Sequence, residues 1–557
     1  MPFIDDTLIC WEVKTESSAS ERNPNLEFDL SSKAKVCRLS QLLTFALVQC
    51  EHPCCLARPD PFLLCLKSHH LLEVICMFRA LLTLLCSTLA VFTLADERPN
   101  IVIIMADDLG WNGLGCYGSE LAQTPCLDQL AAEGMRFTNA YACSQCLPTR
   151  AAIFSGQYGA RTGLTSVETS SPDYAPMISP GRPKALEPEV YTLFEMLRDA
   201  GYKTGMSGKL HLGGPLNTNS ALKNKNRGMK YLHDHGLQWA GTSMPNRNDK
   251  NVSAITDDII RFIEENRDGP FIAYAAHHSP HMPLEVPPSS VQKAVDRGFK
   301  RSSNPRGLFS ERVTADYVAM IEYLDGSIKR ITDKLDELGI AENTLLLFLS
   351  DNGGLSRVWK NDPLRGGKGQ LYEGGVRVPF IVRWPNKVKT GSTCTTPVHV
   401  VDLFPTLMDL VGVQRRKNQI LDGVSLLPLL RQTGSFARDA VFSHHPEYVV
   451  GYAKTPCSMV RKGNYKLIHY FGDYLDPTDC VPGGAGVLYG RFILGSRTEL
   501  YDLNQDPGET QNLANDMPDV TRELLADLQS WWSSTGARMP RPNPNMDRSK
   551  WKWNKND

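Results

Sequence analysis

The sequence has almost no net charge and no internal repeat. Its 557 residues include 60 lysines and arginines against 61 aspartates and glutamates, so the formal net charge is −1. This balance excludes nucleic-acid binding through a global basic field, and it excludes a disordered acidic tail. Hydrophobic residues make up 42% and charged residues 22%, which is typical of a globular protein. The length allows two or more domains with a large core.

The sequence also has no apolar run long enough for a typical membrane-spanning helix in the segment that comes nearest to one. The apolar run over residues 80–94 is short for a spanning helix. Met77 and an arginine precede this run and the small residue Ala95 follows it, which is the pattern of a secretory signal peptide. We therefore expect a signal peptide over residues 77–95 and a true translation start at Met77, with residues 1–76 upstream of it. The alternative is a genuine extension with an uncleaved anchor. The signal peptide predicts export to the periplasm or outside the cell, without stable membrane insertion after cleavage.

The sequence has only one Cys-x-x-Cys pair after residue 97, formed by Cys143 and Cys146. A thioredoxin-like redox pair would need a small domain with a helix starting at the pair, and a zinc site would need further cysteine or histidine partners. Eight of the fifteen cysteines lie at or before Cys86, and seven follow it. Without Cys146 six remain, an even number that an exported chain can pair as disulfides. The spacing does not say which ones pair.

Continuous apolar strands alternate with helices from about residue 97 to residue 420. Residues 100–106 and 344–350 are expected strands, and Thr124 is expected to cap a helix that begins at Pro125. The longest expected helix spans about residues 312–338, where apolar residues recur every three and four positions. Buried strands between helices predict an α/β fold with a mostly parallel central sheet and helices on both faces.

The pattern changes after about residue 421. Short strands of antiparallel type follow, and a last helix is expected near residues 518–533. We expect a first domain over residues 97–420, a smaller C-terminal α+β domain with an antiparallel sheet over residues 421–537, and a loose tail over residues 538–557.

Polar side chains gather where the expected strands end, which is where α/β sheets form their sites. Carboxylate and amide oxygens suit Ca²⁺ or Mg²⁺ better than zinc or copper. Taken singly, each acidic segment is more typical of a turn or a helix cap; together, behind two buried strands, they favour a metal site. Two histidines add groups suited to proton transfer near neutral pH. Lys209 and His211 are two residues apart, so both point the same way if the segment is extended. The candidate residues are Asp107, Asp108, Lys209, His211, His281, Asp351 and Asn352.

The segment from Cys146 to Arg150, Cys-Leu-Pro-Thr-Arg, followed by AAIFSGQ, resembles the signature of type I, formylglycine-dependent sulfatases. These arylsulfatase-like enzymes belong to the alkaline-phosphatase-like superfamily. The resemblance extends over residues 97 to about 515, and its blocks occur in the family's order. The blocks are NIVIIMADDLGW, TPCLDQLAAEGMRFTNAY, GYKTGMSGKLHLG, SPHMPL, SDNGG, GGKGQLYEGGVRVP, VDLFPTLMDLVG and ELYDLNQDPGETQNLA.

The resemblance implies a sulfuric ester hydrolase with formylglycine at position 146. A formylglycine-generating enzyme would oxidise Cys146 during maturation, and the hydrated aldehyde would carry the nucleophile. One Ca²⁺, with Mg²⁺ as the alternative, would bind Asp107, Asp108, Asp351, Asn352 and the modified residue 146. Arg150 would hold the modified residue. Lys209 and Lys368 would bind sulfate, His211 would accept a proton from the hydrated aldehyde, and His281, with Lys368, would bind the ester and protonate the leaving alcohol.

Two positions depart from the family's common pattern, and the substrate is open. Thr149 replaces the commoner serine but keeps the hydroxyl, and Leu210 replaces a frequent tryptophan. We expect a sulfate monoester on a sulfated saccharide or an aryl group, selected by loops near residues 165–185, 212–250 and 471–497. Two alternatives are a phosphomonoester or phosphonate-ester hydrolase of the same superfamily, and a non-catalytic secreted binding protein.

Overall fold

The computed structural model describes most of the chain after residue 97. The expected signal peptide and the segment before it lie outside the described residues, and residues 95–557 form one compact unit. No helix in the described ranges is long and apolar enough to cross a membrane. The described residues are 98–167, 173–213, 225–242, 244–305, 312–448, 455–475, 481–482, 488–489 and 492–547.

The central sheet is built around three fully buried parallel strands, β1 (Asn100–Ala106), β6 (Phe271–Ala276) and β7 (Thr344–Ser350). In the described residues the strand order is β10-β2-β8-β7-β1-β6-β4-β5, and β9 pairs with β2. Only β8 runs antiparallel to its neighbours β2 and β7, so the predicted mostly parallel sheet is confirmed. The other strands are β2 (Met135–Tyr141), β4 (Lys203–Gly208), β5 (Trp239–Ala240), β8 (Arg377–Arg383), β9 (Ser392–Cys394) and β10 (Val398–His399).

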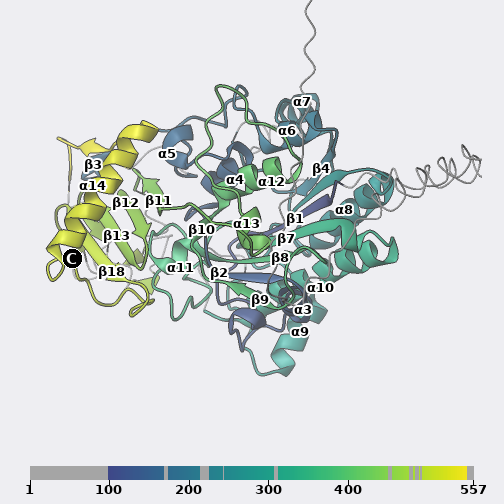
Figure 1. Ribbon diagram of the computed structural model, residues 1–557. Helices are drawn as coiled ribbons and strands as arrows, with labels where there is room; N and C mark the ends of the chain where they lie inside the picture. Colours follow the sequence, from purple (N-terminus) through teal and green to yellow (C-terminus); the bar gives the residue numbers. More distant parts are fainter. Residues whose placement is uncertain are drawn as a thin grey trace, which may run out of the picture. The chain divides into compact units, whose positions relative to one another are not determined.

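Helices cover both faces of this sheet, as predicted (Figure 1). Alternate residues of β1 enter two separate cores: Ile103 and Met105 face one, while Val102 and Ile104 face the other. The first core includes α4 (Cys146–Ser155), α6 (Leu193–Asp199) and α12 (Leu403–Leu410). The second includes α3 (Pro125–Glu133), α8 (Val252–Asn266), α9 (Pro288–Asp296) and α10 (Ala315–Glu337).

The helix α3 begins at Pro125 as predicted, but Thr124 does not cap it. The Thr124 hydroxyl instead accepts a hydrogen bond from the Gly115 backbone and donates one to Asp128. The first turn is capped by Asp325 of α10, which accepts hydrogen bonds from the backbone N–H groups of Cys126 (3.1 Å) and Leu127 (2.8 Å). Because α3 packs against α10, the Asp325 carboxylate binds the free N–H groups at the start of α3, and the Thr124 hydroxyl does not.

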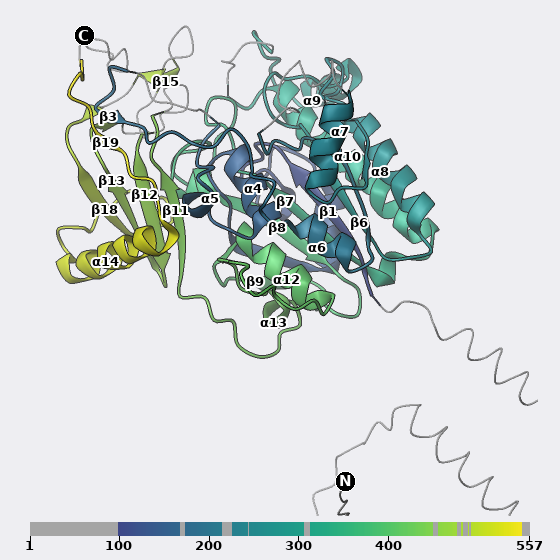
Figure 2. The ribbon, with the colours of Figure 1, turned by 90° about the horizontal axis from the view of Figure 1, so that it is seen from above.

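The antiparallel sheet predicted near the C-terminus is present, with strand order β11-β12-β13-β18. Its strands are β11 (Ala440–His445), β12 (Cys457–Lys462), β13 (Tyr465–Tyr470) and β18 (Arg497–Asp502). Helix α14 (Pro518–Thr535) lies along this sheet (Figure 2) and buries Leu524, Leu528 and Trp531. The domain boundary near residue 421 stays a prediction, since both sheets belong to the same compact unit.

The described part of the C-terminal tail is not loose. Strand β19 (Arg541–Pro542) pairs with β3 (Met177–Ile178) in antiparallel fashion. The Asn543 side chain also donates hydrogen bonds to the carbonyl groups of Asp173 and Ala175, both at 2.7 Å. Chain ends are usually poorly ordered unless a partner holds them, and here the distant residues 173–178 supply the partners.

Candidate active site

Two neighbouring strands place the predicted metal-ligand residues together. Asp107 and Asp108 follow β1, and Asp351 and Asn352 follow the parallel strand β7, in which Ser350 is the partner of Ala106. All four side chains are buried. The backbone N–H of Asp108 donates to Asp351 Oδ1 (3.2 Å), and Asn352 Nδ2 donates to Asp108 Oδ1 (2.9 Å).

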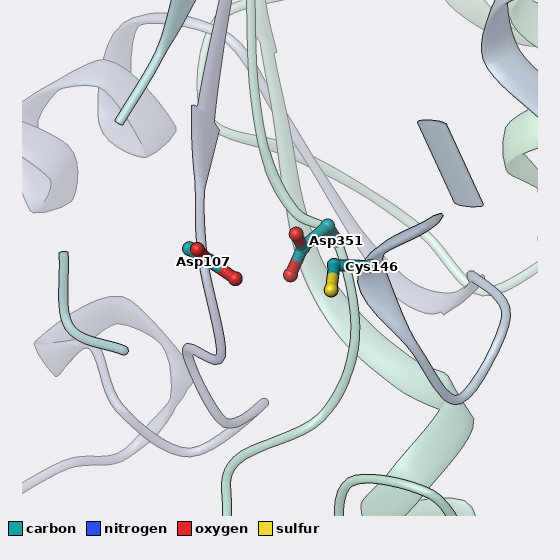
Figure 3. A group of neighbouring side chains, drawn as sticks. All are labelled: Asp107, Cys146 and Asp351. Carbon is teal, nitrogen blue, oxygen red and sulfur yellow. The ribbon is translucent and has the colours of Figure 1, made fainter. Parts of the chain in front are cut away.

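Cys146 is the first residue of α4, and its side chain reaches the same carboxylates (Figure 3). Its sulfur and one carboxylate oxygen each of Asp107 and Asp351 all lie within 4.8 Å of one another. Thr149 stabilises the turn before the helix. Its hydroxyl accepts a hydrogen bond from the Cys143 N–H (3.0 Å) and donates one to the Cys143 carbonyl (3.3 Å). The hydroxyl at position 149 is therefore a structural feature of this turn.

The cysteines of the described residues are all thiols, so no disulfide forms among them. Cys143 and Cys146 are both buried and do not bond to each other. Cys480, the remaining cysteine after residue 97, lies outside the described residues. Of the two residues in the Cys-x-x-Cys pair, only Cys146 faces the acidic cluster.

Arg150, one helical turn after Cys146, is fully buried. Its Nη2 and Nε donate to Asp351 Oδ2 at 2.7 and 3.1 Å, and its Nη1 donates to the Lys209 carbonyl at 2.5 Å. Burial alone would lower the pKa of Arg150, but the Tyr274 hydroxyl and the Asp351 carboxylate raise it above its usual value. The arginine therefore stays charged and fixes the orientation of Asp351.

Two lysines lie against the two aspartates that follow β1. Lys209 Nζ is 2.7 Å from Asp107 Oδ2, and Lys368 Nζ is 2.6 Å from Asp108 Oδ1. Burial would raise the pKa of Asp107, but the positive charge of Lys209 leads a group of cations that holds it well below its usual range. Lys368 does the same for the pKa of Asp108. Both aspartates are therefore ionised.

The two predicted proton-transfer histidines also lie at this edge of the sheet. His281 Nε2 is 3.7 Å from Asp108 Oδ2, and its Nδ1 contacts the Met282 carbonyl at 2.5 Å. Partial burial of the ring, which is 32% exposed, and the charge of Lys368 lower the pKa of His281 to about 4. Burial, and then the charge of Lys209, lowers the pKa of His211 well below its usual value. Both imidazoles are therefore neutral near neutral pH in this arrangement.

The segment of Lys209 and His211 is not extended, so alternation along a strand does not apply to these two residues. Strand β4 ends at Gly208, and His211 adopts a left-handed backbone conformation with φ of 50°. The two side chains still share one environment, because the charges of Lys209 and Arg150 both act on the His211 ring. Backbone curvature, and not strand alternation, brings them together.

The residues present fit a hard divalent cation. Within the described residues, Asp107 Oδ1 and Asn352 Oδ1 are buried oxygens without a hydrogen-bond partner. Leaving two such acceptors unpaired is costly, and a cation bound between the strand ends would satisfy both. The carboxylates of Asp108 and Asp351 complete an all-oxygen set of protein ligands. The site can therefore hold a metal ion of the Ca²⁺ or Mg²⁺ type.

Residues that no sequence pattern indicates support this site from elsewhere in the chain. Tyr274 places its hydroxyl 3.4 Å from Arg150 Nη1. Ser144 Oγ lies 3.0 Å from His445 Nδ1, on the antiparallel sheet, while the Ser144 carbonyl accepts a hydrogen bond (2.7 Å) from Gly369, next to Lys368. Ser144 and His445 are 301 residues apart, so no spacing rule indicates their contact.

The chain matches two protein-family models. The model described as sulfatase matches residues 99–413, and the model described as N-sulphoglucosamine sulphohydrolase, C-terminal, matches residues 367–477. The first match spans both strand ends, Cys146 and His281.

Similar proteins include sulfatases over most of their length. Arylsulfatase A of Homo sapiens is 33% identical over 494 residues, which cover 81% of this chain and 89% of the human protein. A sulfatase of Formosa agariphila is 30% identical over 539 residues, covering 80% of this chain and 93% of that protein. A crystal structure of Ps i-CgsB in complex with k-i-k-neocarrahexaose shares the fold, with a TM-score of 0.62, 22% identity, and coverage of 81% of this chain and 96% of that one. With Cys146 held against an acidic cluster at the carboxyl edge of an alkaline-phosphatase-like sheet, the chain belongs to the sulfatase family and is a sulfuric ester hydrolase.

Proposed function

We propose that this sulfatase acts through formylglycine made from Cys146 and through one Ca²⁺ held by Asp107, Asp108, Asp351, Asn352 and residue 146. The observation that carries the proposal is the position of the Cys146 sulfur, within 4.8 Å of carboxylate oxygens of Asp107 and Asp351. A soft thiol is a poor ligand in an all-oxygen set for a hard cation. The hydrated aldehyde places oxygen there instead, so the sulfur atom stands in for a diol oxygen. Mg²⁺ is the alternative ion.

The two lysines change partners when a divalent cation occupies the cluster. Lys209 and Lys368 pair with Asp107 and Asp108 at 2.7 and 2.6 Å. A bound cation would neutralise these carboxylates and compete with the ammonium groups for them. The lysines are then available to bind the sulfuryl oxygens and to offset charge as the ester bond breaks.

The remaining residues provide orientation and proton transfer. The hydrated aldehyde supplies one hydroxyl for attack on sulfur and a second hydroxyl whose deprotonation releases the product. Arg150 orients the Asp351 carboxylate relative to the helix that begins at Cys146. His281, near Asp108, protonates the departing alcohol oxygen, and His211 accepts the proton of the second hydroxyl. Anionic substrate and a bound cation would both shift the pKa values of these two histidines, because each brings a charge close to the imidazole rings.

We propose sulfated saccharides or aryl sulfates as substrates. The family match to a sulphoglucosamine sulphohydrolase C-terminal region and the likeness to arylsulfatase A support these two classes. A formylglycine-generating enzyme is the maturation partner, since the Cys-x-Pro-Thr-Arg segment is complete. We also propose export, to the periplasm or outside the cell, on the basis of the signal-peptide pattern at residues 77–95.

The test is mass spectrometry of the tryptic peptide FTNAYACSQCLPTR, residues 137–150, from protein made together with a formylglycine-generating enzyme. We expect an aldehyde at position 146 and an unmodified thiol at Cys143. Protein made without the enzyme is the matched control and should carry two thiols and release no sulfate. A thiol at position 146 in active protein would overturn the proposed nucleophile.

A further inference from the structure

Lys250 is a buried lysine near the site that the proposed chemistry does not use. It lies in the turn before α8, within one of the loops expected to select the substrate, and it is only 3% exposed. Removing an ammonium group from water is unfavourable unless an anion compensates it. A lysine in a turn normally extends into solvent, so its burial here needs a reason.

The backbone of this turn is held in an uncommon conformation. Lys250 and Asn251 are consecutive non-glycine residues with left-handed φ angles of 59° and 58°. Asp249 stabilises the turn, because its carboxylate accepts hydrogen bonds from the N–H groups of Asn251 (3.0 Å) and Ser253 (3.1 Å). Such conformations are costly and are concentrated at ligand-binding sites. In this case the turn carries the Lys250 side chain into the protein.

The charge of Lys250 is only loosely compensated. Its Nζ is 3.6 Å from Glu285 Oε2, a long contact compared with the 2.7 and 2.6 Å of the two lysine–aspartate pairs at the site. Burial lowers the pKa of Lys250, and the charges of Glu285 and Asp107 oppose this effect, while Lys209 adds to it. Glu285 follows the proposed proton-transfer residue His281 by four residues, so the contact with Glu285 places Lys250 beside the segment that carries His281.

We propose that Lys250, oriented by Glu285, forms a subsite for a second anionic group on the substrate, a carboxylate or a second sulfate beside the sulfate that is cleaved. This inference rests on the proposed function and narrows its substrate class. Once a cation binds Asp107, that carboxylate no longer compensates Lys250, and a buried ammonium whose ion pair with Glu285 is 3.6 Å long then favours an anion over a neutral hydroxyl.

The experiment compares phenyl sulfate, 3-carboxyphenyl sulfate and resorcinol bis-sulfate, with released sulfate measured by ion chromatography. In Lys250→Gln, we expect KM for the two substrates with a second anion to rise about tenfold or more, as the loss of a charged hydrogen bond predicts. KM and kcat for phenyl sulfate should stay within about twofold. Lys250→Arg should restore most of the affinity. A KM effect for only one of the two identifies carboxylate or sulfate as the group recognised.

The controls separate the subsite from folding and from the proposed function. Lys230→Gln changes an exposed lysine paired with Asp234 and should alter none of the three substrates. If Lys250→Gln leaves Glu285 unpaired and unfolds, the double variant Lys250→Gln with Glu285→Gln removes both charges together. If Lys250→Gln changes KM equally for all three substrates, or for none of them, the proposed subsite is wrong. Sulfate release by the wild type would still support the proposed function. If the wild type carries no aldehyde and releases no sulfate, both the proposed function and the subsite are wrong.

Discussion

The guanidinium group of Arg150 donates two hydrogen bonds to a single oxygen of Asp351, Oδ2, and both side chains are fully buried. The other oxygen of Asp351 accepts a hydrogen bond from the Asp108 backbone. Arg150 belongs to the helix that starts at Cys146, while Asp351 follows β7. This pair therefore connects the helix carrying the proposed nucleophile to the strand end carrying a proposed cation ligand, and it fixes how the carboxylate is oriented.

Replacing Arg150 with alanine should lower both stability and turnover. The variant removes both hydrogen bonds to Asp351 Oδ2 and leaves this buried carboxylate without its cationic partner, so in metal-free protein we expect a loss of about 3–5 kcal/mol in the free energy of unfolding. Arg150→Lys keeps the charge but not the two parallel donors and should lose less stability. Urea denaturation and sulfate release measure the two effects, with the exposed Arg522→Ala as control. Wild-type stability in Arg150→Ala would contradict the role of this ion pair.

Replacing Cys146 should separate attack on sulfur from product release. Cys146→Ala has no nucleophile and should release no sulfate while keeping the fold. Cys146→Ser has one hydroxyl that can attack but lacks the second hydroxyl, so we expect a chain that retains one sulfate, visible by intact mass spectrometry. Cys143→Ser should keep its turnover, because Cys143 does not face the acidic cluster. Multiple turnovers by Cys146→Ser would show that the diol is not needed.

Removing the proposed cation should lower activity and thermal stability together. A chelator leaves Asp107 Oδ1 and Asn352 Oδ1 without a partner. Ca²⁺ at a hundred times its dissociation constant should restore about 2.7 kcal/mol of stability, measured as a rise in melting temperature. Asn352→Ala should reduce this rise. A melting temperature that does not respond to Ca²⁺ or to Mg²⁺ would argue against a cation at these strand ends.

The contact between Ser144 and His445 should matter for turnover. It joins the antiparallel sheet to Ser144, two positions before Cys146. The Ser144 carbonyl also accepts a hydrogen bond from the N–H of Gly369, which follows Lys368. We expect His445→Ala to lose about 1–3 kcal/mol of stability, because a buried hydrogen bond is removed, and to lower kcat. His445→Gln can still bond to Ser144 and should recover most of kcat. Equal kcat in both variants and the wild type would limit the contact to a structural role.

A buried cluster away from the site predicts a pH dependence of stability. Lys466 Nζ is 2.9 Å from oxygens of both Glu373 and Glu509. Burial, and the charge of Glu373, raise the pKa of Glu509 to about 7, although Lys466 opposes this. Folded Glu509 therefore binds its proton more tightly than the unfolded chain does, so its contribution is present at low pH and is lost as the pH rises towards about 7.

The matching measurement is urea denaturation between pH 5 and pH 7, a range of about two units below the raised pKa. Glu509→Gln removes the titrating group, so its free energy of unfolding should fall less with rising pH than that of the wild type. The exposed Glu189→Gln should follow the wild type. Parallel pH profiles for wild type and Glu509→Gln would show that Glu509 does not titrate in this range.

Predictions that depend on neighbouring residues agree closely with the structure. The helix expected over residues 312–338 is α10, Ala315–Glu337, because its apolar period is local and regular. The helix after Cys146 ends where Gly156 adopts a left-handed φ of 66°. Predictions that needed distant partners failed: Asp325 replaces Thr124 as the cap of α3, and residues 173–178 hold the tail.

The sequence by itself determined the family, the mostly parallel sheet and the residue types of the site, because strand ends, helix starts and short motifs are encoded by residues next to one another. Only the tertiary structure decided which atoms meet. Packing brings together the side chains of three arrangements: the ion pair of Arg150 with Asp351, the contact of Ser144 with His445, and the burial of Lys250. Contacts between residues far apart in the chain form only when the two cores and both sheets are assembled, so no local pattern can specify them.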